Sequence, residues 1–255
     1  MKVLVFGGTF EAVEIADALV ARGHSVTTSL AGRSDEPRKP RGKLITGGLG
    51  GADGIADYLG KHRIEFVVDA THPFALNISG HVLAAATRLN VPLIHYVRPR
   101  FSEPANSHWW RVESAELAAD RIPVGARAFL TLGRESLEAF IRRRDVQFVL
   151  RAIEMPEMAL PDNFDVVLAR PPFTRADELA LMRKDRVTHL VAKDSGGQMT
   201  RAKLDAAFMI NVQVIMVNRP TLPDAPHVST ISEVLAVFDE LPAPKVGALR
   251  RLFTA

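Results

Sequence analysis

A glycine turn near the start of the chain has the composition of a phosphate-binding loop. The residues Gly7-Gly8-Thr9-Phe10-Glu11 follow an apolar run and open a segment with helical periodicity. Backbone N–H groups in such a turn, together with the dipole of the following helix, can cradle a pyrophosphate. The alternative is a tight turn that needs glycine for steric reasons alone. We predict that Gly7, Gly8, Thr9 and Glu11 bind a dinucleotide cofactor.

The second apolar run ends in Ser29-Leu30-Ala31-Gly32-Arg33. An enzyme that uses NAD usually carries an acidic residue at this point, where it hydrogen-bonds the ribose hydroxyls, whereas the first charge here is Arg33. An arginine beside a serine can pair with a 2′-phosphate, which favours NADPH over NADH. A solvated loop arginine is the alternative. The predicted cofactor site therefore includes Ser29, Ala31, Gly32 and Arg33.

Two further turns carry polar or glycine-rich sequence after an apolar run. The segment Gly47-Gly48-Leu49-Gly50-Gly51 suits close approach of the backbone to a ligand, with a flexible turn as the alternative. The segment Asp69-Ala70-Thr71-His72-Pro73-Phe74 contains an imidazole that titrates near neutral pH. His72 is therefore a candidate general acid, although it could equally cap a helix or orient a loop. Gly47, Gly48, Thr71 and Pro73 join the predicted cofactor site.

Cations follow several apolar runs in the second half of the chain. One of these cations is Lys193, which begins the stretch Lys193-Asp194-Ser195-Gly196-Gly197. A possible helix cap, Thr200, follows this stretch. Several guanidinium groups that converge on one cleft suit a ligand with many carboxylates, since each binds a carboxylate in bidentate fashion. Surface ion pairs with Glu135 and Glu154 are the alternative. The predicted substrate site consists of Arg98, Arg134, Arg151, Lys193, Ser195, Gly196, Thr200 and Lys203.

Several kinds of catalytic site are missing from the sequence. With no cysteine there is no disulfide, thiolate nucleophile or iron–sulfur cluster. The eight histidines show neither H-E-x-x-H nor another compact ligand spacing, so we expect no metal. The absence of G-x-S-x-G removes a common hydrolase motif.

The composition is that of an ordinary globular protein. The chain has 255 residues, of which 47% are hydrophobic and 24% charged, and its net charge of +3 is weak support for a nucleic-acid partner. The apolar run before the first glycines is too short for a signal peptide, and no run approaches a membrane span. We expect a cytoplasmic protein without a membrane partner.

Short apolar runs alternate with helical patterns along almost the whole chain, which is typical of βαβ units and a mostly parallel sheet. The predicted strands cover residues 2–6, 25–29, 43–46, 65–69, 92–97, 126–131, 147–151, 165–169, 188–192 and 212–217. The predicted helices cover residues 11–21, 54–61, 75–89, 134–143, 175–184, 201–208 and 232–239.

This pattern predicts an α/β protein with two Rossmann-like domains whose mostly parallel sheets face one another across a cleft. We expect a cofactor-binding domain at residues 1–100, a crossing segment at 101–125, a second, ligand-binding domain at 126–245 and a basic tail at 246–255.

Taken together, the motifs resemble the precorrin-6A reductase family of corrin biosynthesis. The resemblance runs from about Val3 to Leu241. It rests on the order and spacing of several motifs. These are the glycine-containing turns described above, the Asp69–Ala75 turn, Arg98-Pro99, and Ser195-Gly196-Gly197 with Thr200, Lys203 and Leu204. It implies NADPH-dependent reduction of one double bond in a metal-free tetrapyrrole with several carboxylates, which gives precorrin-6B.

The resemblance also assigns roles to individual residues. It implies that Gly7, Gly8 and Thr9 hold the pyrophosphate, that Ser29 and Arg33 hold the 2′-phosphate, and that the Asp69–Phe74 turn lies beside the nicotinamide. Lys193, Ser195 and Gly196 would face the macrocycle. The chain departs from the family pattern at Val13, Pro171 and Asp194, where the family often has arginine, glycine and asparagine.

The sequence leaves the proton donor and some alternatives open. The proton that follows the hydride could come from His72, Asp194 or water. The alternative functions are a cobalt-precorrin-6A reductase, a non-catalytic NADP-binding sensor, and a transferase that uses a sugar nucleotide. The oligomeric state is expected to be a monomer or a small homo-oligomer.

Overall fold

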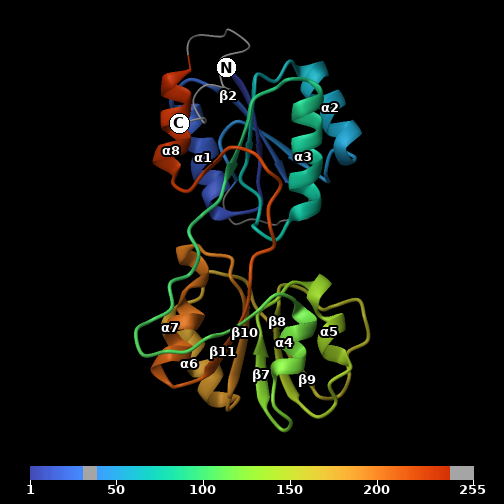
Figure 1. Ribbon diagram of the computed structural model, residues 1–255, viewed down its shortest axis with the longest axis vertical. Coiled ribbons are helices and arrows are strands. Elements are labelled where there is room, and N and C mark those ends of the chain that lie inside the picture. Colours follow the sequence, from blue (N-terminus) through green and yellow to red (C-terminus); the bar gives the residue numbers. More distant parts are fainter. Residues whose placement is uncertain (31–38, 242–255) are drawn as a thin grey trace. The chain divides into compact units, whose positions relative to one another are not determined.

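The protein consists of two compact units, each built around its own six-stranded parallel sheet (Figure 1). The structure is a computed structural model that describes residues 1–30 and 39–241. Unit 1 comprises Met1–Arg98 and Thr221–Ala255, and unit 2 comprises Pro99–Pro220. The two units are described separately below.

The sheet of unit 1 has the strand order of a dinucleotide-binding domain. Its elements are β1 (Lys2–Phe6), α1 (Phe10–Ala21), β2 (Ser25–Leu30), β3 (Lys43–Thr46), α2 (Gly51–His62), β4 (Phe66–Asp69), α3 (Leu76–Arg88), β5 (Leu93–Tyr96), β12 (His227–Val228) and α8 (Ile231–Glu240). The strands are ordered β12-β5-β4-β1-β2-β3, and all their pairings are parallel. The order reverses between β1 and β4, and ligands of such sheets bind outside the carboxyl ends of the strands at this switch point.

Helices cover both faces of this sheet. One core cluster joins β1 and β4 to α1 and α8 and includes Ile15, Leu19, Phe66 and Phe238. A second cluster on the other face joins the sheet to α2 and α3 through Ile55, Leu59 and Val82. Because both faces are buried at the centre of the sheet, β1 and β4 are mostly apolar on both sides, as the sequence pattern indicated.

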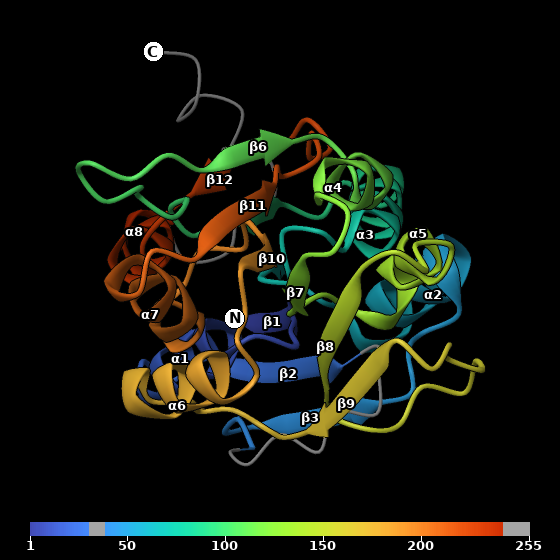
Figure 2. The same cartoon turned by 90° about the horizontal axis from the view of Figure 1, so that it is seen from below.

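Unit 2 repeats the same arrangement. Its elements are β6 (Trp110–Val112), α4 (Ala115–Arg121), β7 (Arg127–Leu130), the 3-10 helix η1 (Arg134–Ser136), α5 (Glu138–Ile141), β8 (Gln147–Ala152), β9 (Phe164–Leu168), α6 (Arg175–Lys184), β10 (His189–Lys193), the 3-10 helix η2 (Gln198–Thr200), α7 (Ala202–Met209) and β11 (Gln213–Val217). The parallel strands are ordered β6-β11-β10-β7-β8-β9, as Figure 2 shows. The switch point lies between β7 and β10, so the turns after these two strands are the expected ligand-binding edge.

The fold class is confirmed, but the expected domain boundaries are not. The segment 101–125, expected to be a crossing, contains β6 and α4 and belongs to unit 2. Residues 221–241, expected in the second domain, return to unit 1, where β12 pairs with β5 and α8 packs on α1. The reason is burial, since Val234 and Phe238 of α8 complete the apolar cover of the first sheet. The expected tail at 246–255 lies outside the described residues.

One predicted helix is also wrong in detail. The pattern at 134–143 predicted a continuous helix, whereas the structure has η1 followed by the single turn α5. The segment meets the sheet through Leu137, Ala139 and Phe140, which are buried. Two short helical turns are sufficient to bury these side chains.

Candidate functional site

The turn after β1 brings the backbone close to β2 and leaves one side open. The N–H of Gly7 donates to the carbonyl of Ser29 at 2.9 Å. A Cβ atom at Gly7 would lie 3.2 Å from side-chain carbons of both Leu30 and Thr28, so the position has little room for a larger residue. Gly8 has φ +114°, and a Cβ there would meet nothing within 4 Å. The turn therefore offers exposed backbone at the start of a helix, which fits a phosphate group.

Thr9 connects this turn to the turn after β4. Its side chain caps α1 by accepting a hydrogen bond from the N–H of Ala12 at 3.1 Å. The same hydroxyl donates to the carbonyl of Ala70 at 2.9 Å. Because β1 and β4 flank the switch point, Thr9 holds together the two turns between which a dinucleotide is expected to bind.

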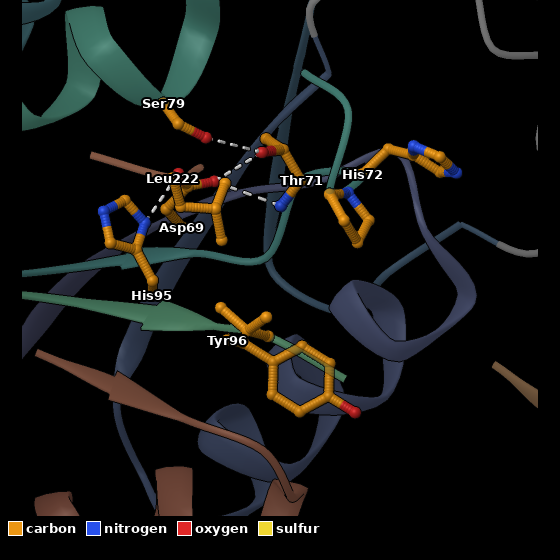
Figure 3. Close-up of a pocket in the computed structure, with 9 residues that line it drawn as sticks. Asp69, Thr71, His72, Ser79, His95, Tyr96 and Leu222 are labelled. Carbon is orange, nitrogen blue, oxygen red and sulfur yellow. Dashed lines mark hydrogen bonds and ion pairs between the residues drawn. The ribbon is translucent and has the colours of Figure 1, made fainter. Parts of the chain in front are cut away.

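A buried hydrogen-bond network follows β4 (Figure 3). The Nδ1 atom of His95 on β5 lies 2.9 Å from Oδ2 of Asp69, and both side chains are at most 3% exposed. The other carboxylate oxygen of Asp69 accepts from the N–H and the hydroxyl of Thr71, at 3.1 and 2.7 Å. The Thr71 hydroxyl also lies 3.2 Å from that of Ser79 on α3. The network therefore fixes the Thr71 turn to β5 and α3.

The environment of Asp69 determines its protonation state. Burial by itself raises the pKa of this carboxyl group, but hydrogen bonds from His95 and nearby hydroxyls outweigh burial, so the pKa lies below its ordinary value. Asp69 is therefore ionised at neutral pH and accepts a hydrogen bond from Nδ1 of His95. The Nε2 atom of His95 is buried and has no hydrogen-bond partner among the described residues.

His72 lies at the edge of a small pocket in this region. Asp69, Thr71, His72, Pro73, Ser79, His95, Tyr96, Val97 and Leu222 line the pocket, whose free volume is about 10 Å³. Figure 3 shows the His72 ring directed away from Asp69 and His95. The Nδ1 atom of His72 accepts from the N–H of Phe74 at 3.3 Å, and the two rings lie 5.7 Å apart. His72 therefore helps to order its own turn, and part of its side chain is exposed.

Glu11 and Arg98, which the sequence assigned to different ligands, bind each other. The Nη1 atom of Arg98 donates to Oε2 of Glu11 at 2.8 Å, and the two side chains are 11% and 13% exposed. The pair fixes the first turn of α1 to the segment after β5. Arg98 is thus a residue of unit 1, and its guanidinium group is partly neutralised by Glu11.

The remaining cofactor candidates lie at the carboxyl ends of β2 and β3. Ser29 is 2% exposed near the end of β2. Gly47 and Gly48 follow β3 with φ of +95° and +77°. Ala31, Gly32 and Arg33 lie outside the described residues, so their predicted roles stay predictions.

Two of the arginines predicted to bind the substrate are in ion pairs within unit 2. Arg151 makes two hydrogen bonds of 2.9 Å to Glu178, and these side chains are 10% and 3% exposed. The Arg151 guanidinium also lies 3.8 Å from the ring centre of Phe173. Arg134 pairs with Glu154 at 3.1 Å in an exposed position. The Nη1 atom of Arg151 thus binds Glu178 and its face is covered by Phe173, while its predicted role in substrate binding stays a prediction.

The turn after β10 contains the other predicted substrate residues. Lys193 donates to Glu135 at 2.6 Å, and Ser195 and Lys203 are buried. Gly196 has φ +67°, and its carbonyl accepts from the Thr200 hydroxyl at 3.2 Å. The turn is therefore well ordered by its own hydrogen bonds at the switch point of the second sheet.

Asp194, which the sequence suggested as a proton donor, is enclosed by the protein. Its side chain is fully buried, and its Oδ1 accepts from the N–H of Phe101 at 3.0 Å. Its Oδ2 lies 3.5 Å from Arg100 and 3.2 Å from Arg111. The side chain is thus hydrogen-bonded and ion-paired within unit 2, and its predicted role as a proton donor stays a prediction.

Three residues that matter for these sites were not singled out from the sequence: His95, Arg111 and Arg219. His95 interrupts the apolar strand Leu93–Tyr96, which is a detectable signal for a paired buried group. Arg111 donates to the Asp194 carboxylate, and the Nε of Arg219 donates to the Asp194 carbonyl. Neither arginine carries such a signal, because both contacts depend on the pairing of β6, β11 and β10. In the described part of the chain, no group of three metal-ligating side chains occurs, and no helix is long and apolar enough to cross a membrane.

The two doubly wound parallel sheets define an α/β protein of the Rossmann-like class. Within this class, the model of the family described as precorrin-6x reductase CbiJ/CobK matches residues 2–239. The chain belongs to this family of reductases.

Known relatives agree with this assignment. The chain is 43% identical over 235 residues to a precorrin-6A reductase of Rhodococcus erythropolis, covering 91% of this chain and 94% of the relative. It is 28% identical to a cobalt-precorrin-6A reductase of Priestia megaterium, covering 91% and 96%. A solved structure named CobK precorrin-6A reductase matches with a TM-score of 0.89 and 34% identity, covering 94% of this chain and 96% of that one.

Proposed function

We propose that this protein is an NADPH-dependent precorrin-6A reductase that reduces one double bond of the macrocycle to give precorrin-6B. The observation that carries the proposal is the open Gly7-Gly8 turn at the switch point of unit 1, in a chain similar over nearly its whole length to proteins of that name. The turn offers backbone N–H donors for a pyrophosphate, and the family to which the chain belongs indicates the substrate.

The residues present fit the dinucleotide. Gly8 leaves open space over the start of α1, and Thr9 holds the turns after β1 and β4 at a fixed separation. In the sequence, Arg33 is the first charged residue after Ser29, a pattern that favours a cofactor with a 2′-phosphate. We therefore assign NADPH rather than NADH as the cofactor.

The chain itself contributes positioning rather than covalent chemistry. Bound NADPH supplies the hydride. The Asp69, His95 and Ser79 side chains hold the Thr71 turn, which is proposed to lie beside the nicotinamide, so this edge of the site does not need to reorganise during the reaction. We assign delivery of the proton to His72, because its imidazole lines the pocket at this edge and is partly exposed.

The metal-free substrate is favoured by the relatives. This chain is 43% identical to the precorrin-6A reductase of Rhodococcus erythropolis and 35% identical to that of Rhodobacter capsulatus. It is 28% identical to the cobalt-precorrin-6A reductase of Priestia megaterium. We therefore propose metal-free precorrin-6A, with the cobalt-containing substrate as the second candidate.

The test combines purified protein with precorrin-6A and either NADPH or NADH, and follows cofactor absorbance and the visible spectrum of the pigment. We expect turnover with NADPH that falls strongly with NADH. Arg33→Ala is expected to raise the KM for NADPH about 10- to 100-fold, as loss of a charged hydrogen bond predicts. Arg22→Ala is the matched control, because Arg22 caps the distant end of α1 and pairs with Asp239.

Other outcomes would select other functions. Turnover of only the cobalt-containing tetrapyrrole would mean that this compound is the substrate instead of metal-free precorrin-6A. Tight NADPH binding without oxidation in the presence of either tetrapyrrole would favour a sensor. Equal use of NADH and NADPH would contradict the role given to Arg33.

A further inference from the structure

A partly buried ion pair lies beside the turn that is proposed to hold the pyrophosphate. Glu11 is in the first turn of α1, and Arg98 follows β5. The Nη1 atom of Arg98 lies 2.8 Å from Oε2 of Glu11, and the side chains of Arg98 and Glu11 are 11% and 13% exposed. Because little solvent reaches the pair, its charges are screened less than those of a surface pair.

Glu11 carries its charge in a turn that a phosphate is expected to use. The first N–H groups of a helix have no acceptor within the helix, and they attract anions. In α1, the Thr9 hydroxyl accepts from the N–H of Ala12. No acceptor in the described part of the chain takes the N–H groups of Phe10 and Glu11, so these two remain open to a phosphate. An ionised carboxylate in the same turn is attracted to these N–H groups and repels a phosphate.

Arg98 holds the Glu11 carboxylate on the side of the turn that faces the end of β5. The segment that carries Arg98 is fixed to β12, because the N–H of Val97 donates to the carbonyl of Val228 at 2.8 Å. At the other end of the pair, Thr9 fixes the turn that carries Glu11 to the turn after β4. The charge-assisted hydrogen bond therefore joins two anchored segments, and it places a positive charge directly on the carboxylate.

The hydroxyl of Tyr96, the last residue of β5, responds to both charges. Burial raises the pKa of the Tyr96 hydroxyl, and Glu11 raises it further. Arg98 lowers this pKa, whereas Glu14 and Glu233 raise it. Loss of the Arg98 charge would therefore make the region beside the first turn of α1 more negative.

We propose that Arg98 is a positioning residue for the cofactor, which holds and neutralises the Glu11 carboxylate so that the first turn of α1 can bind the pyrophosphate. In this role Arg98 acts through Glu11. The backbone N–H of Glu11 is offered to the phosphate, while its side chain is kept away from it. This inference rests on the proposed function, because the group that binds is the pyrophosphate of NADPH.

The test measures the Kd for NADPH, by cofactor fluorescence, in full-length Arg98→Gln, Glu11→Gln and the double variant. Arg98→Gln should raise the Kd about tenfold, the scale of one charge at a helix N-terminus. Glu11→Gln should change the Kd little. The double variant should recover most of the affinity, since no carboxylate is left to neutralise. Arg98→Lys keeps a positive charge and should bind more tightly than Arg98→Gln.

An exposed ion pair of the same unit supplies the control. Arg88, in the last turn of α3, pairs with Asp53 at 2.8 Å, and the two side chains are 51% and 88% exposed. Arg88→Gln removes the same charge from unit 1 as Arg98→Gln does, so it accounts for the change in net charge. We expect the Kd for NADPH to be unchanged in Arg88→Gln.

Melting temperatures separate this role from a purely structural one. Arg98→Gln and the double variant both lose the link between α1 and the segment after β5, so both should melt at a lower temperature than the wild type. Only the double variant should regain NADPH affinity. A double variant that binds NADPH as weakly as Arg98→Gln overturns the inference. An unchanged Kd in Arg98→Gln, or a Glu11→Gln variant that binds as weakly as Arg98→Gln, also overturns it.

The same titration distinguishes this inference from the proposed function, because it needs no tetrapyrrole. If the protein binds NADPH with the expected order of affinities but reduces no tetrapyrrole, the role of Arg98 is supported and only the proposed reaction fails. If the wild type reduces precorrin-6A and the variants do not follow this order, only the role of Arg98 fails. A wild-type protein that does not bind NADPH overturns both.

Discussion

At the scale of single residues, the structure distinguishes groups that bind the protein from groups that remain available to a ligand. Asp69, Arg151 and Asp194 are buried and paired, so their charges are used within the fold. His72 and Arg100 are more exposed. Residue type alone does not make this distinction, since ionisable side chains near strand ends occur both among the buried, paired residues and among the more exposed ones.

The Asp69 and His95 pair predicts a dependence of stability on pH. Because the folded state lowers the pKa of Asp69, the pair stabilises the fold fully above the unfolded pKa of about 4 and loses this contribution as the pH falls through the lower folded value. Asp69→Asn is expected to cost about 2 kcal/mol at pH 7. Urea unfolding should show this difference shrinking towards pH 2. A difference that is constant with pH would contradict it.

The assignment of the proton donor predicts the effect of removing His72. His72→Ala should lower kcat about 100-fold and leave the KM for NADPH nearly unchanged, since general acid catalysis contributes at least that factor. Stopped-flow absorbance of NADPH across neutral pH measures this. His227→Ala is the control, because His227 lies exposed on β12. Full turnover in His72→Ala would exclude His72 as the proton donor.

At the scale of elements, helix caps and turns decide where backbone groups are available. Thr9 and Thr230 both cap helices of unit 1, and Thr230 forms a capping box with Glu233. Only Thr9 also donates to the turn after β4. The two threonines therefore separate the effect of a cap on stability from its effect on the cofactor site.

This comparison gives a matched pair of variants. Thr9→Ala and Thr230→Ala should each cost about 1 kcal/mol of stability, the usual value for an N-cap. Only Thr9→Ala should also weaken NADPH binding, by about tenfold, because the Ala70 carbonyl loses its donor and the two turns are no longer linked. Cofactor fluorescence titration measures the affinity. Equal NADPH affinity in both variants would mean that Thr9 acts only as a cap.

At the scale of the whole molecule, the end of the described chain completes the unit in which the chain begins. The helix α8 packs on α1, and β12 takes the sixth position in the sheet beside β5. Phe238 lies 4.7 Å from the ring of Phe66 and 5.1 Å from that of His24. Unit 1 is therefore incomplete without residues that follow unit 2 in the sequence.

This topology predicts that α8 stabilises the cofactor-binding unit. Phe238→Ala should cost about 3 to 5 kcal/mol, the usual range for a buried phenylalanine, and should lower the denaturant concentration at which NADPH binding is lost. Phe208→Ala is the control, since Phe208 is 44% exposed on α7 of unit 2. Chemical unfolding monitored by cofactor binding tests both. Equal effects would contradict the assignment of α8 to unit 1.

The sequence by itself determined the alternation of strands and helices, the parallel sheets and the placement of Gly7, Gly8 and Thr9 after β1. These features depend on neighbours in the chain, since periodicity and glycine turns act locally. It also determined that Asp69 and Asp194 lie at the carboxyl ends of strands.

Only the tertiary structure decided what these groups contact. His95 meets Asp69 because β4 and β5 pair in register, and Arg111 reaches Asp194 because β6 and β11 pair at the far side of the second sheet. Residues 221–241 return to unit 1 because the first sheet has an edge and an apolar face left to cover. Burial and pairing between distant segments depend on the folded arrangement, so a local pattern cannot specify them.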